Sequence, residues 1–285
     1  MTISSTNLEF ELLRNLICNE CGIFLKENKK YLIENRLSRL ALNSGCRSFA
    51  EFYRKITESP HGSELRDEVI NAITTQETLW LRDSHPFKIL SDQVFPYYEQ
   101  KIQNARKKEI TIWSAACSTG QEPYSIVMTA MDYNKKSGVT LESIERLKVL
   151  ATDISTKALQ TAKEGRYDKT AIMRGMPDHY LADYFDKSED HYIIKDIIKK
   201  RVTFRQFNLK YPASGLFGPF DIIFLRNVII YFSDDFKKAL MERVAQMLKP
   251  DGHLFLGTGE CVEGYSEKFI CIEECGSVYY RLKCG

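Results

Sequence analysis

The sequence predicts a parallel, doubly wound α/β sheet that follows a small all-helical domain. From Ile110 onward, short apolar runs alternate with amphipathic helical stretches, which is typical of repeated βαβ units. Before about residue 77, apolar residues recur only at helical spacing. We therefore expect a helical domain over residues 1–77 and an α/β domain over residues 78–285.

The helical domain is expected to hold four helices. The first follows the potential caps Ser5–Asn7 and stops at Gly22. The second runs from about Glu27 to Leu42. The third starts at Ser48, where the sequence S-F-A-E forms a capping box, and the fourth starts near Ser63.

Six strands and three helices are expected from Ile110 onward, and a helix or two over residues 84–108. The strands are predicted at residues 110–116, 148–153, 202–207, 220–226, 253–258 and 278–283. The helices are predicted at residues 122–135, 156–164 and 235–248. Ser155 and Gly165 bracket the second of these helices as N-cap and C-cap.

Composition and charge narrow the class of protein. Apolar residues make up 44% of the 285-residue chain and the net charge is +2, so nothing predicts a nucleic-acid partner. No signal peptide or membrane-spanning run is seen, and we expect a cytoplasmic monomer. The pair Cys18 and Cys21 has no second pair at zinc-site spacing, so no metal site is predicted.

The stretch "ITIWSAACSTGQEPYS" (residues 110–125) carries a strand into a turn and then into a helix. Its small side chains and Gly120 let a ligand approach the backbone closely. It lacks both the three glycines of the dinucleotide fingerprint and the G-K-[ST] of a phosphate-binding loop. A tight strand-to-helix turn without a ligand remains the alternative for this stretch alone.

Polar residues at the ends of other strands strengthen the case for a ligand, because the carboxyl ends of parallel strands form the binding edge. Asp153 ends the second strand, where a carboxylate can hold a ribose diol. Asn208 can read an adenine edge, and Arg226, Asn227 and Tyr231 follow an apolar strand. A ribose acid and an adenine reader without phosphate machinery suggest S-adenosylmethionine. Glu122 can then meet the ammonium group of that ligand.

Several motifs in order then resemble the chemotaxis protein methyltransferase (CheR) family. "ITTQETLWLRD" (residues 73–83) is similar to the family signature T-T-x-x-T-x-F-F-R-[DE]. The other matching segments are "WSAACSTGQEPYS", "ATDIS", Asn208–Leu209 and "FDIIFLRNVIIYF". The resemblance implies a Rossmann-like class I methyltransferase domain that carries a small antiparallel β-subdomain, here at about residues 177–201.

The family resemblance implies methyl transfer from S-adenosylmethionine to glutamate side chains of methyl-accepting chemoreceptors, which gives γ-glutamyl methyl esters and S-adenosylhomocysteine. By similarity, the cofactor contacts fall on Gln76, Thr78, Arg82, Glu122, Asp153, Asn208, Leu209, Arg226 and Asn227. Arg82 and Tyr231 match residues near the transferred methyl group. The family usually has Asn at position 76 and a Phe pair where Trp80 and Leu81 stand here.

Residues 26–55 hold eight basic and three acidic residues, a net charge of +5. We expect Lys29, Arg36 and Arg39 to form a basic stripe that docks the acidic methylation helices of receptors. A solvated basic flank is the alternative. "HYIIK" and "DIIKKRVTF" are expected as short antiparallel strands of the β-subdomain. Some family members bind a receptor's C-terminal pentapeptide through a glycine-bearing loop there; residues 186–205 contain no glycine, so pentapeptide independence is expected.

Other functions are weighed against this interpretation. A base-methylating enzyme would need a [DN]-P-P-[YFW] tetrad where this chain reads R-N-V-I, or a Pro-Cys pair, which is absent. A non-catalytic S-adenosylmethionine-binding adaptor or sensor in a chemosensory array is the main alternative. The presence of both Arg82 and Tyr231 favours an active enzyme. A small-molecule methyltransferase would give the basic helical domain no evident use.

Overall fold

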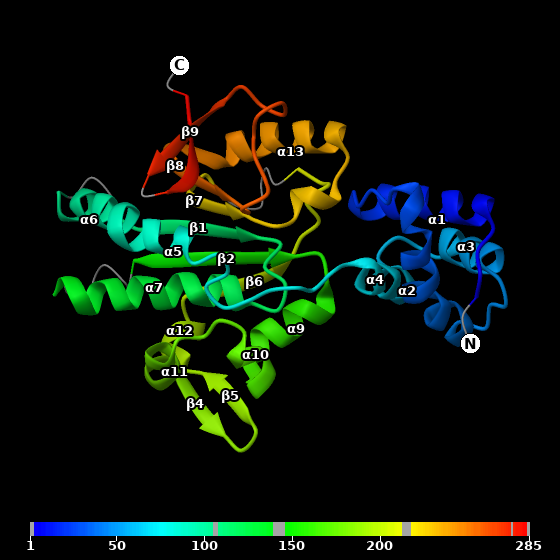
Figure 1. Cartoon of the computed structure of the whole chain (residues 1–285), viewed down its shortest axis with the longest axis horizontal. Helices are drawn as coiled ribbons and strands as arrows, with labels where there is room; N and C mark the ends of the chain where they lie inside the picture. The colour runs from blue at the N-terminus through cyan, green and yellow to red at the C-terminus, as the bar shows by residue number, and fades with distance from the viewer. Residues whose placement is uncertain (1–2, 105–107, 139–145, 213–217, 275, 284–285) are drawn as a thin grey trace.

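The computed structural model describes residues 3–104, 108–138, 146–212, 218–274 and 276–283. The outer ends of the two predicted domains, residues 1–2 and 284–285, therefore lie outside the described residues. The predicted fold class is confirmed: an all-helical N-terminal part, a mostly parallel sheet flanked by helices and a small antiparallel sheet (Figure 1).

The N-terminal part packs its helices around one apolar core. The core is built from buried side chains such as Leu13, Ile33 and Phe52. Its elements are α1 (Asn7–Cys21), η1 (Glu27–Lys29), α2 (Lys30–Asn43), α3 (Phe49–Glu58) and α4 (Glu64–Ile73). Gly22 ends α1 in the left-handed conformation, with φ 78°, as predicted.

The capping boxes of this part differ from the prediction. The Ser48 hydroxyl accepts the Glu51 N–H at 3.2 Å, but the Glu51 carboxylate turns back to the N–H of Arg47 instead of that of Ser48. The reciprocal pair of bonds is complete at Thr6 and Glu9 instead, at the start of α1. The Ser48 prediction is thus half right, because Glu51 finds a donor one residue earlier.

The main sheet has the strand order β6-β2-β1-β7-β8-β10-β9. Five neighbouring strands run parallel, and β10 pairs antiparallel with both β8 and β9. The strands are β1 (Ile110–Ala115), β2 (Leu147–Asp153), β6 (Val202–Gln206), β7 (Phe220–Leu225), β8 (Leu248–Leu256), β9 (Phe269–Glu274) and β10 (Ser277–Leu282). The arrows of β1 and β2 point toward the helical domain, so that domain stands at the carboxyl edge of the sheet (Figure 1).

Helices cover both faces of this sheet. Along β7, Ile222 and Phe224 join the apolar core under α7, whereas Ile223 and Leu225 join the core under α13. This alternation is what a strand buried on both faces requires. The helical elements around the sheet are α5 (His85–Ile89), η2 (Leu90–Val94), α6 (Phe95–Gln103), α7 (Gln121–Ser137), α9 (Thr156–Glu164), η3 (Ile229–Tyr231) and α13 (Asp234–Met247).

The antiparallel β-subdomain has the order β3-β5-β4 and projects from one side of the molecule (Figure 1). It begins at β3 (Arg166–Asp168), before the predicted start at residue 177. The prediction for "HYIIK" is confirmed by β5 (His191–Ile194), but that for "DIIKKRVTF" is wrong. Residues 196–199 form a helical turn, whereas the strand predicted at residues 202–207 is confirmed as Val202–Gln206, which joins the main sheet in parallel with β2 and leaves its apolar side chains half-buried. The other elements of the β-subdomain region are α10 (Lys169–Met173), α11 (Asp178–Tyr184), β4 (Phe185–Ser188) and α12 (Asp196–Lys199).

The sequence predicted only the second half of β8 and did not predict β9 at all. β8 begins at Leu248, five residues before the predicted start, although it contains Pro250 and Gly252. A register shift in the β7–β8 pairing between Phe220 and Ile222 accommodates these residues. β9 lies at the edge of the sheet, and after the buried Phe269 its side chains are exposed or half-buried, which leaves little apolar pattern to detect.

Candidate active site

A cleft lies between the carboxyl edge of the sheet and the helical domain. It encloses about 1130 Å³ of empty space, open solvent at its mouth included. Its walls come from the loops after β1, β2, β6 and β7, from the segment that links the two domains, and from the helical domain itself. The cleft is therefore shared between the two domains.

The structure brings the predicted site residues together. All nine predicted cofactor contacts and Tyr231 line this one cleft. Arg36 lines it too, whereas Lys29 and Arg39 do not. The three basic residues therefore do not form one continuous surface stripe, because Arg36 faces the cleft while Lys29 and Arg39 lie outside it.

The loop after β1 forms the floor of the cleft. Ala116 and Ser118 adopt left-handed backbone conformations, with φ 61° and 51°, and Gly120 has φ 95°. A Cβ on Gly120 would lie 2.9 Å from the Cβ of Ala162 in α9, so the turn tolerates no side chain there. The small residues bring backbone close to the cleft, as the sequence predicted.

Asp153 closes β2 with a carboxylate held in place by backbone donors. The N–H of Ser118 donates to Oδ2 at 2.8 Å, and the N–H of Ser155 donates to Oδ1 at 2.9 Å. Ser155 is the N-cap of α9, as predicted, and its hydroxyl accepts the N–H of Ala158. Burial raises the pKa of the Asp153 carboxyl, an effect opposed by these N–H donors.

A buried ion-pair network stands beside it. The Arg226 guanidinium, 1% exposed, lies 3.0 Å from Glu122 and 2.7 Å from Asp83. Ser114 donates to the other oxygen of Glu122 at 2.8 Å. Burial raises the pKa of Glu122, although the charge of Arg226 opposes that shift. The Nε of Arg226 is buried and has no hydrogen-bond partner among the described residues.

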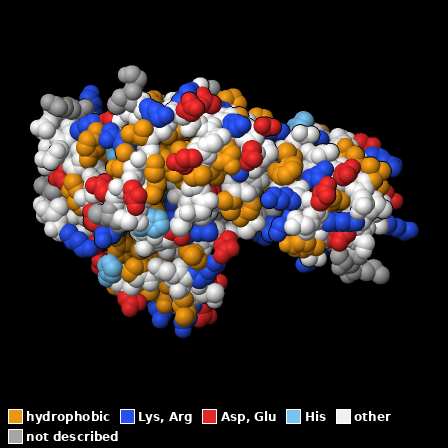
Figure 2. Space-filling model, turned by 45° about the horizontal axis from the view of Figure 1, so that its top comes forward, with side chains coloured by type: hydrophobic (Ala, Val, Ile, Leu, Met, Phe, Trp, Pro, Cys, Tyr) orange, Lys and Arg blue, Asp and Glu red, His pale blue; other side chains and the backbone are white. Residues whose placement is uncertain are grey.

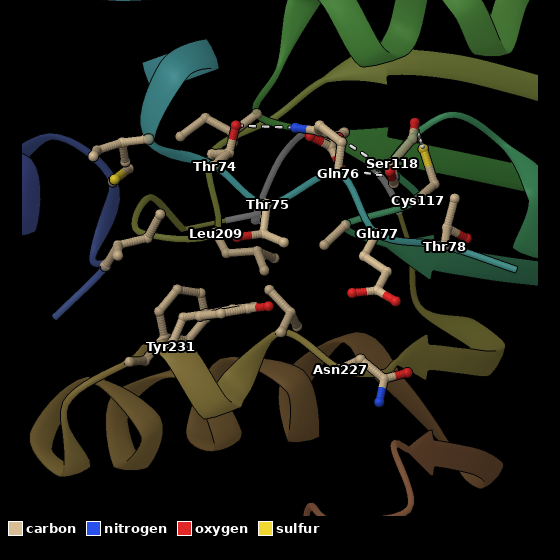
Figure 3. A pocket seen from close by; sticks show the side chains of 18 of the residues that line it. Thr74, Thr75, Gln76, Glu77, Thr78, Cys117, Ser118, Leu209, Asn227 and Tyr231 are labelled. Carbon is tan, nitrogen blue, oxygen red and sulfur yellow. Dashed lines mark hydrogen bonds between the residues drawn. The ribbon is translucent and has the colours of Figure 1, made fainter. Parts of the chain in front are cut away.

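Gln76 binds the linker, the segment that links the two domains, to the loop after β1. Its amide nitrogen donates to the Thr74 hydroxyl at 2.9 Å, and its oxygen accepts the Ser118 hydroxyl at 3.0 Å (Figure 3). Arg36 binds the same linker, donating to the carbonyl of Ile73 and to Thr75. Gln76 thus uses its amide to join the linker to the β1 loop.

Further along the linker, Arg82 donates a side-chain hydrogen bond, 3.2 Å long, to the carbonyl of Glu77, the single hydrogen bond of its guanidinium to the described part of the chain. Its side chain is half-buried, and Thr78 lines the cleft nearby. Arg226 is paired with two carboxylates, whereas Arg82 is paired with none among the residues that the structure describes. Arg82 is therefore the better candidate to bind the carboxylate of a substrate.

Asn208 and Leu209 follow β6 and reach the helical domain. The Asn208 amide donates to the carbonyl of Glu20 at 2.7 Å and accepts the N–H of Lys210 at 3.0 Å. Lys210 also donates to the carbonyl of Asn19, so the two side chains cap the C-terminal turn of α1. One of the two amide hydrogens of Asn208 remains for a ligand.

Tyr231 ends the short helix η3, and its hydroxyl end points toward the middle of the cavity (Figure 3). Its carbonyl accepts the N–H of Phe24 at 2.8 Å, which ties this turn to the helical domain. Asn227, just before η3, has a left-handed backbone with φ 56°.

Sequence analysis missed two features of the site. The first is the wall that the helical domain supplies through Cys21, Ile23, Leu25 and Leu32, apolar residues that read as ordinary core. The second is backbone strain: of seven described non-glycine residues with positive φ, six lie in the linker, the β1 loop or the β7 loop. Neither leaves a pattern in the sequence, because both depend on how the domains and loops meet.

The residues of the cleft fit a nucleoside-bearing sulfonium ligand. Asp153 offers carboxyl lone pairs to a diol, and Glu122, which pairs with Arg226, offers an acceptor to an ammonium group. Apolar side chains such as Phe207 and Leu209 give a surface for a heterocycle. Among the described residues, no group of three or more His, Cys, Asp or Glu side chains is arranged to hold a metal ion. In the same part of the chain, no helix is long and apolar enough to cross a membrane.

Comparison with known proteins places these features in context. Residues 76–276 match the family model described as "CheR methyltransferase, SAM binding domain", and residues 8–74 match "CheR methyltransferase, all-alpha domain". The chain is 40% identical to chemotaxis protein methyltransferase Cher2 of Pseudomonas putida over 282 residues, 99% of this chain and 100% of the relative. It is 38% identical to chemotaxis protein methyltransferase 1 of Pseudomonas aeruginosa, with 99% and 100% covered. Against the chemotaxis protein methyltransferase of Escherichia coli, identity is 32%, with 94% and 89% covered.

Proposed function

The chain belongs to the CheR methyltransferase family, and we propose that it methylates glutamate side chains of chemoreceptors with S-adenosylmethionine. One observation carries the proposal: Asp153, Glu122, Arg82 and Tyr231 converge from separate segments on a single cleft at the carboxyl edge of the sheet. The products are a γ-glutamyl methyl ester and S-adenosylhomocysteine. The non-catalytic adaptor is not favoured by the names of the relatives.

The cofactor supplies a methyl carbon bound to a sulfonium, which a carboxylate oxygen can attack while the carbon–sulfur electrons stay on sulfur. In this chain, Asp153 would hold the ribose and Glu122 the ammonium group, with Asn208, Leu209 and Gln76 along the wall. The charge of Arg226 opposes the rise that burial causes in the pKa of Glu122. Thr78 and Asn227 complete the enclosure.

The chain has no proton to remove from the substrate. A glutamate carboxyl has a pKa of about 4.3, so it is an anion at neutral pH and needs neither a general base nor a metal ion. The chain's task is to orient and partly desolvate the reactants, which can lower the barrier greatly. We assign the steering of the substrate carboxylate to Arg82 and a hydrogen bond near the reacting centre to Tyr231.

We further propose that the helical domain docks the receptor while it closes the cofactor cleft. Basic side chains gather where the smaller lobe meets the larger one on the face shown in Figure 2. Lys29 and Arg39 lie outside the cleft and are available to an acidic helix, whereas Arg36 holds the linker. The docking contribution is therefore expected from Lys29 and Arg39 more than from Arg36.

Pentapeptide independence also stays a proposal. The turn between β4 and β5 is made without glycine, and Glu189 takes the left-handed conformation there, with φ 49°. Removing the last five residues of a receptor should leave its methylation rate unchanged. A large loss of rate on that truncation would contradict the proposal.

The proposed function is tested by transfer from methyl-labelled S-adenosylmethionine to receptor-containing membranes. The label is scored as volatile methanol released by alkali, which is specific for carboxyl esters. The proposal predicts base-labile label on a receptor-sized band and loss of that label with Arg82→Ala. Tight cofactor binding without any base-labile label would contradict it.

A further inference from the structure

The carboxylate of Glu260, just beyond β8, holds three backbone N–H groups at once. Its Oε2 accepts the N–H of Asn227 at 2.6 Å and that of Gly257 at 2.8 Å. Its Oε1 accepts the N–H of Ile230 at 3.3 Å. Glu260 is half-buried and does not belong to the cleft wall. It therefore touches the site only through the chain segments that it binds.

The segment that Glu260 binds carries two of the proposed site residues. Asn227 lines the cleft, and Ile230 immediately precedes Tyr231 in the turn η3. Asn227 holds a left-handed backbone conformation, with φ 56°, which residues other than glycine adopt only occasionally. A charged acceptor on its N–H stabilises that conformation, since hydrogen bonds to a carboxylate are stronger than those to neutral groups.

Gly257 independently shows that the chain after β8 lies very close to the chain after β7. A Cβ at this position would lie 2.6 Å from Nδ2 of Asn227 and 2.9 Å from its backbone nitrogen. It would also lie 2.7 Å from the carboxylate of Glu260. Only glycine lets the ends of β7 and β8 approach so closely that one carboxylate can span both.

We infer that Glu260 is a positioning residue for the methyl-transfer step, an inference that rests on the proposed function. By fixing the N–H groups of Asn227 and Ile230, it sets the turn from which the Tyr231 side chain enters the cleft. The carboxylate suits this task because it offers acceptors only. An amide would turn one oxygen into an N–H₂ group that faces backbone N–H donors.

The test compares Glu260→Gln with the matched control Glu267→Gln, an exposed glutamate of the following loop. For each variant, kcat and KM are measured by alkali-released methanol, and unfolding is followed in urea. Because small misplacements in an active site can cost about 100-fold in rate, we expect kcat of Glu260→Gln to fall between about 10-fold and 100-fold, with KM for the receptor nearly unchanged. The control should keep wild-type kcat.

A double variant distinguishes positioning from general weakening. If Glu260 acts through Tyr231, the losses in kcat of Glu260→Gln and Tyr231→Phe combine to less than the product of the single losses. Fully multiplicative losses, or a kcat for Glu260→Gln equal to that of the control, would overturn the inference.

Backbone amide hydrogen exchange gives a readout that needs no activity. The amides of Asn227 and Ile230 should exchange at least tenfold faster in Glu260→Gln than in Glu267→Gln, at equal global stability. Unchanged exchange would overturn the inference even if the wild type is active. Conversely, a wild type that transfers no methyl group, with faster exchange in the variant, would refute the proposed function while the structural role of Glu260 stands.

Discussion

The two ends of the central sheet both bury charge, but they use it differently. At the amino end, the fully buried carboxylate of Asp221 accepts the N–H and the hydroxyl of Thr111 at 2.8 and 2.9 Å and lies 3.0 Å from Lys249. At the carboxyl end, the buried Arg226 binds Glu122 and Asp83. Each end of the sheet thus holds a buried charged group that is paired with an opposite charge.

The difference lies in what surrounds each network. None of the amino-end residues Thr111, Asp221 and Lys249 lines the cleft, whereas Glu122 and Arg226 do. The strained left-handed residues also gather at the carboxyl end. The amino end even holds a strongly perturbed group, since burial lowers the pKa of His253 to about 4. A shifted pKa or a buried charge is therefore no mark of function without a cleft and stored backbone strain.

The largest effect is expected from Arg82→Ala at the carboxyl end. Removal of a charged group that positions the substrate carboxylate should lower kcat by about 100-fold to 1000-fold, the usual range for a group that stabilises a transition state. Cofactor affinity, measured by calorimetry, should fall much less than kcat, because the eight other predicted cofactor contacts remain. Full turnover with intact cofactor binding would remove Arg82 from the mechanism.

At the amino end, Lys249→Met should show the opposite behaviour. It removes the half-buried cation beside the fully buried Asp221, and leaving that carboxylate without its cation should cost about 3 kcal/mol of unfolding free energy. Urea unfolding measures this loss, and kcat per folded molecule should not change. A variant of normal stability but low kcat would break the contrast between the two ends.

Tyr231→Phe is expected to have a smaller effect. Losing one hydrogen bond near the reacting centre, about 1.4 kcal/mol, should lower kcat about tenfold without changing stability. Steady-state methyl transfer on receptor membranes measures it. A silent substitution would mean that the ring only encloses the cleft.

The smallest effect is expected from charge reversal at Arg39 and Arg36, the two arginines of α2. Arg39→Glu should raise KM for the receptor about fivefold, roughly 1 kcal/mol for an exposed charge, and added salt should reduce the effect. Arg36→Glu should also weaken cofactor binding, because Arg36 holds the linker at Ile73 and Thr75. Calorimetry and initial rates report the two quantities. Identical behaviour of both variants would contradict the division of labour proposed for α2.

Much of this arrangement could be predicted from local sequence signals. The ends of β2 and β7 place Asp153 and Arg226 at the carboxyl edge, as parallel strands require, and the sheet order then brings them together. The caps Gly22, Ser155 and Gly165 were likewise evident, because capping chemistry is local.

The rest depended on contacts between distant segments. "DIIKKRVTF" was misjudged because a helical turn and an edge strand of the main sheet follow one another within nine residues. Arg36 read as part of a surface stripe, since its bonds to the linker span more than thirty residues. Glu260 had no signal at all, because its backbone partners carry no side-chain pattern.

The contrast between the two ends is tested most directly by one calorimetric titration of S-adenosylmethionine into two isosteric variants, Asp153→Asn and Asp221→Asn. We expect Asp153→Asn to lose at least about tenfold in affinity, because the ribose would lose a charged acceptor. Asp221→Asn should bind as tightly as the wild type, with its cost appearing only in unfolding. Equal losses of affinity in both variants, or a loss confined to Asp221→Asn, would contradict the assignment of cofactor binding to the carboxyl end.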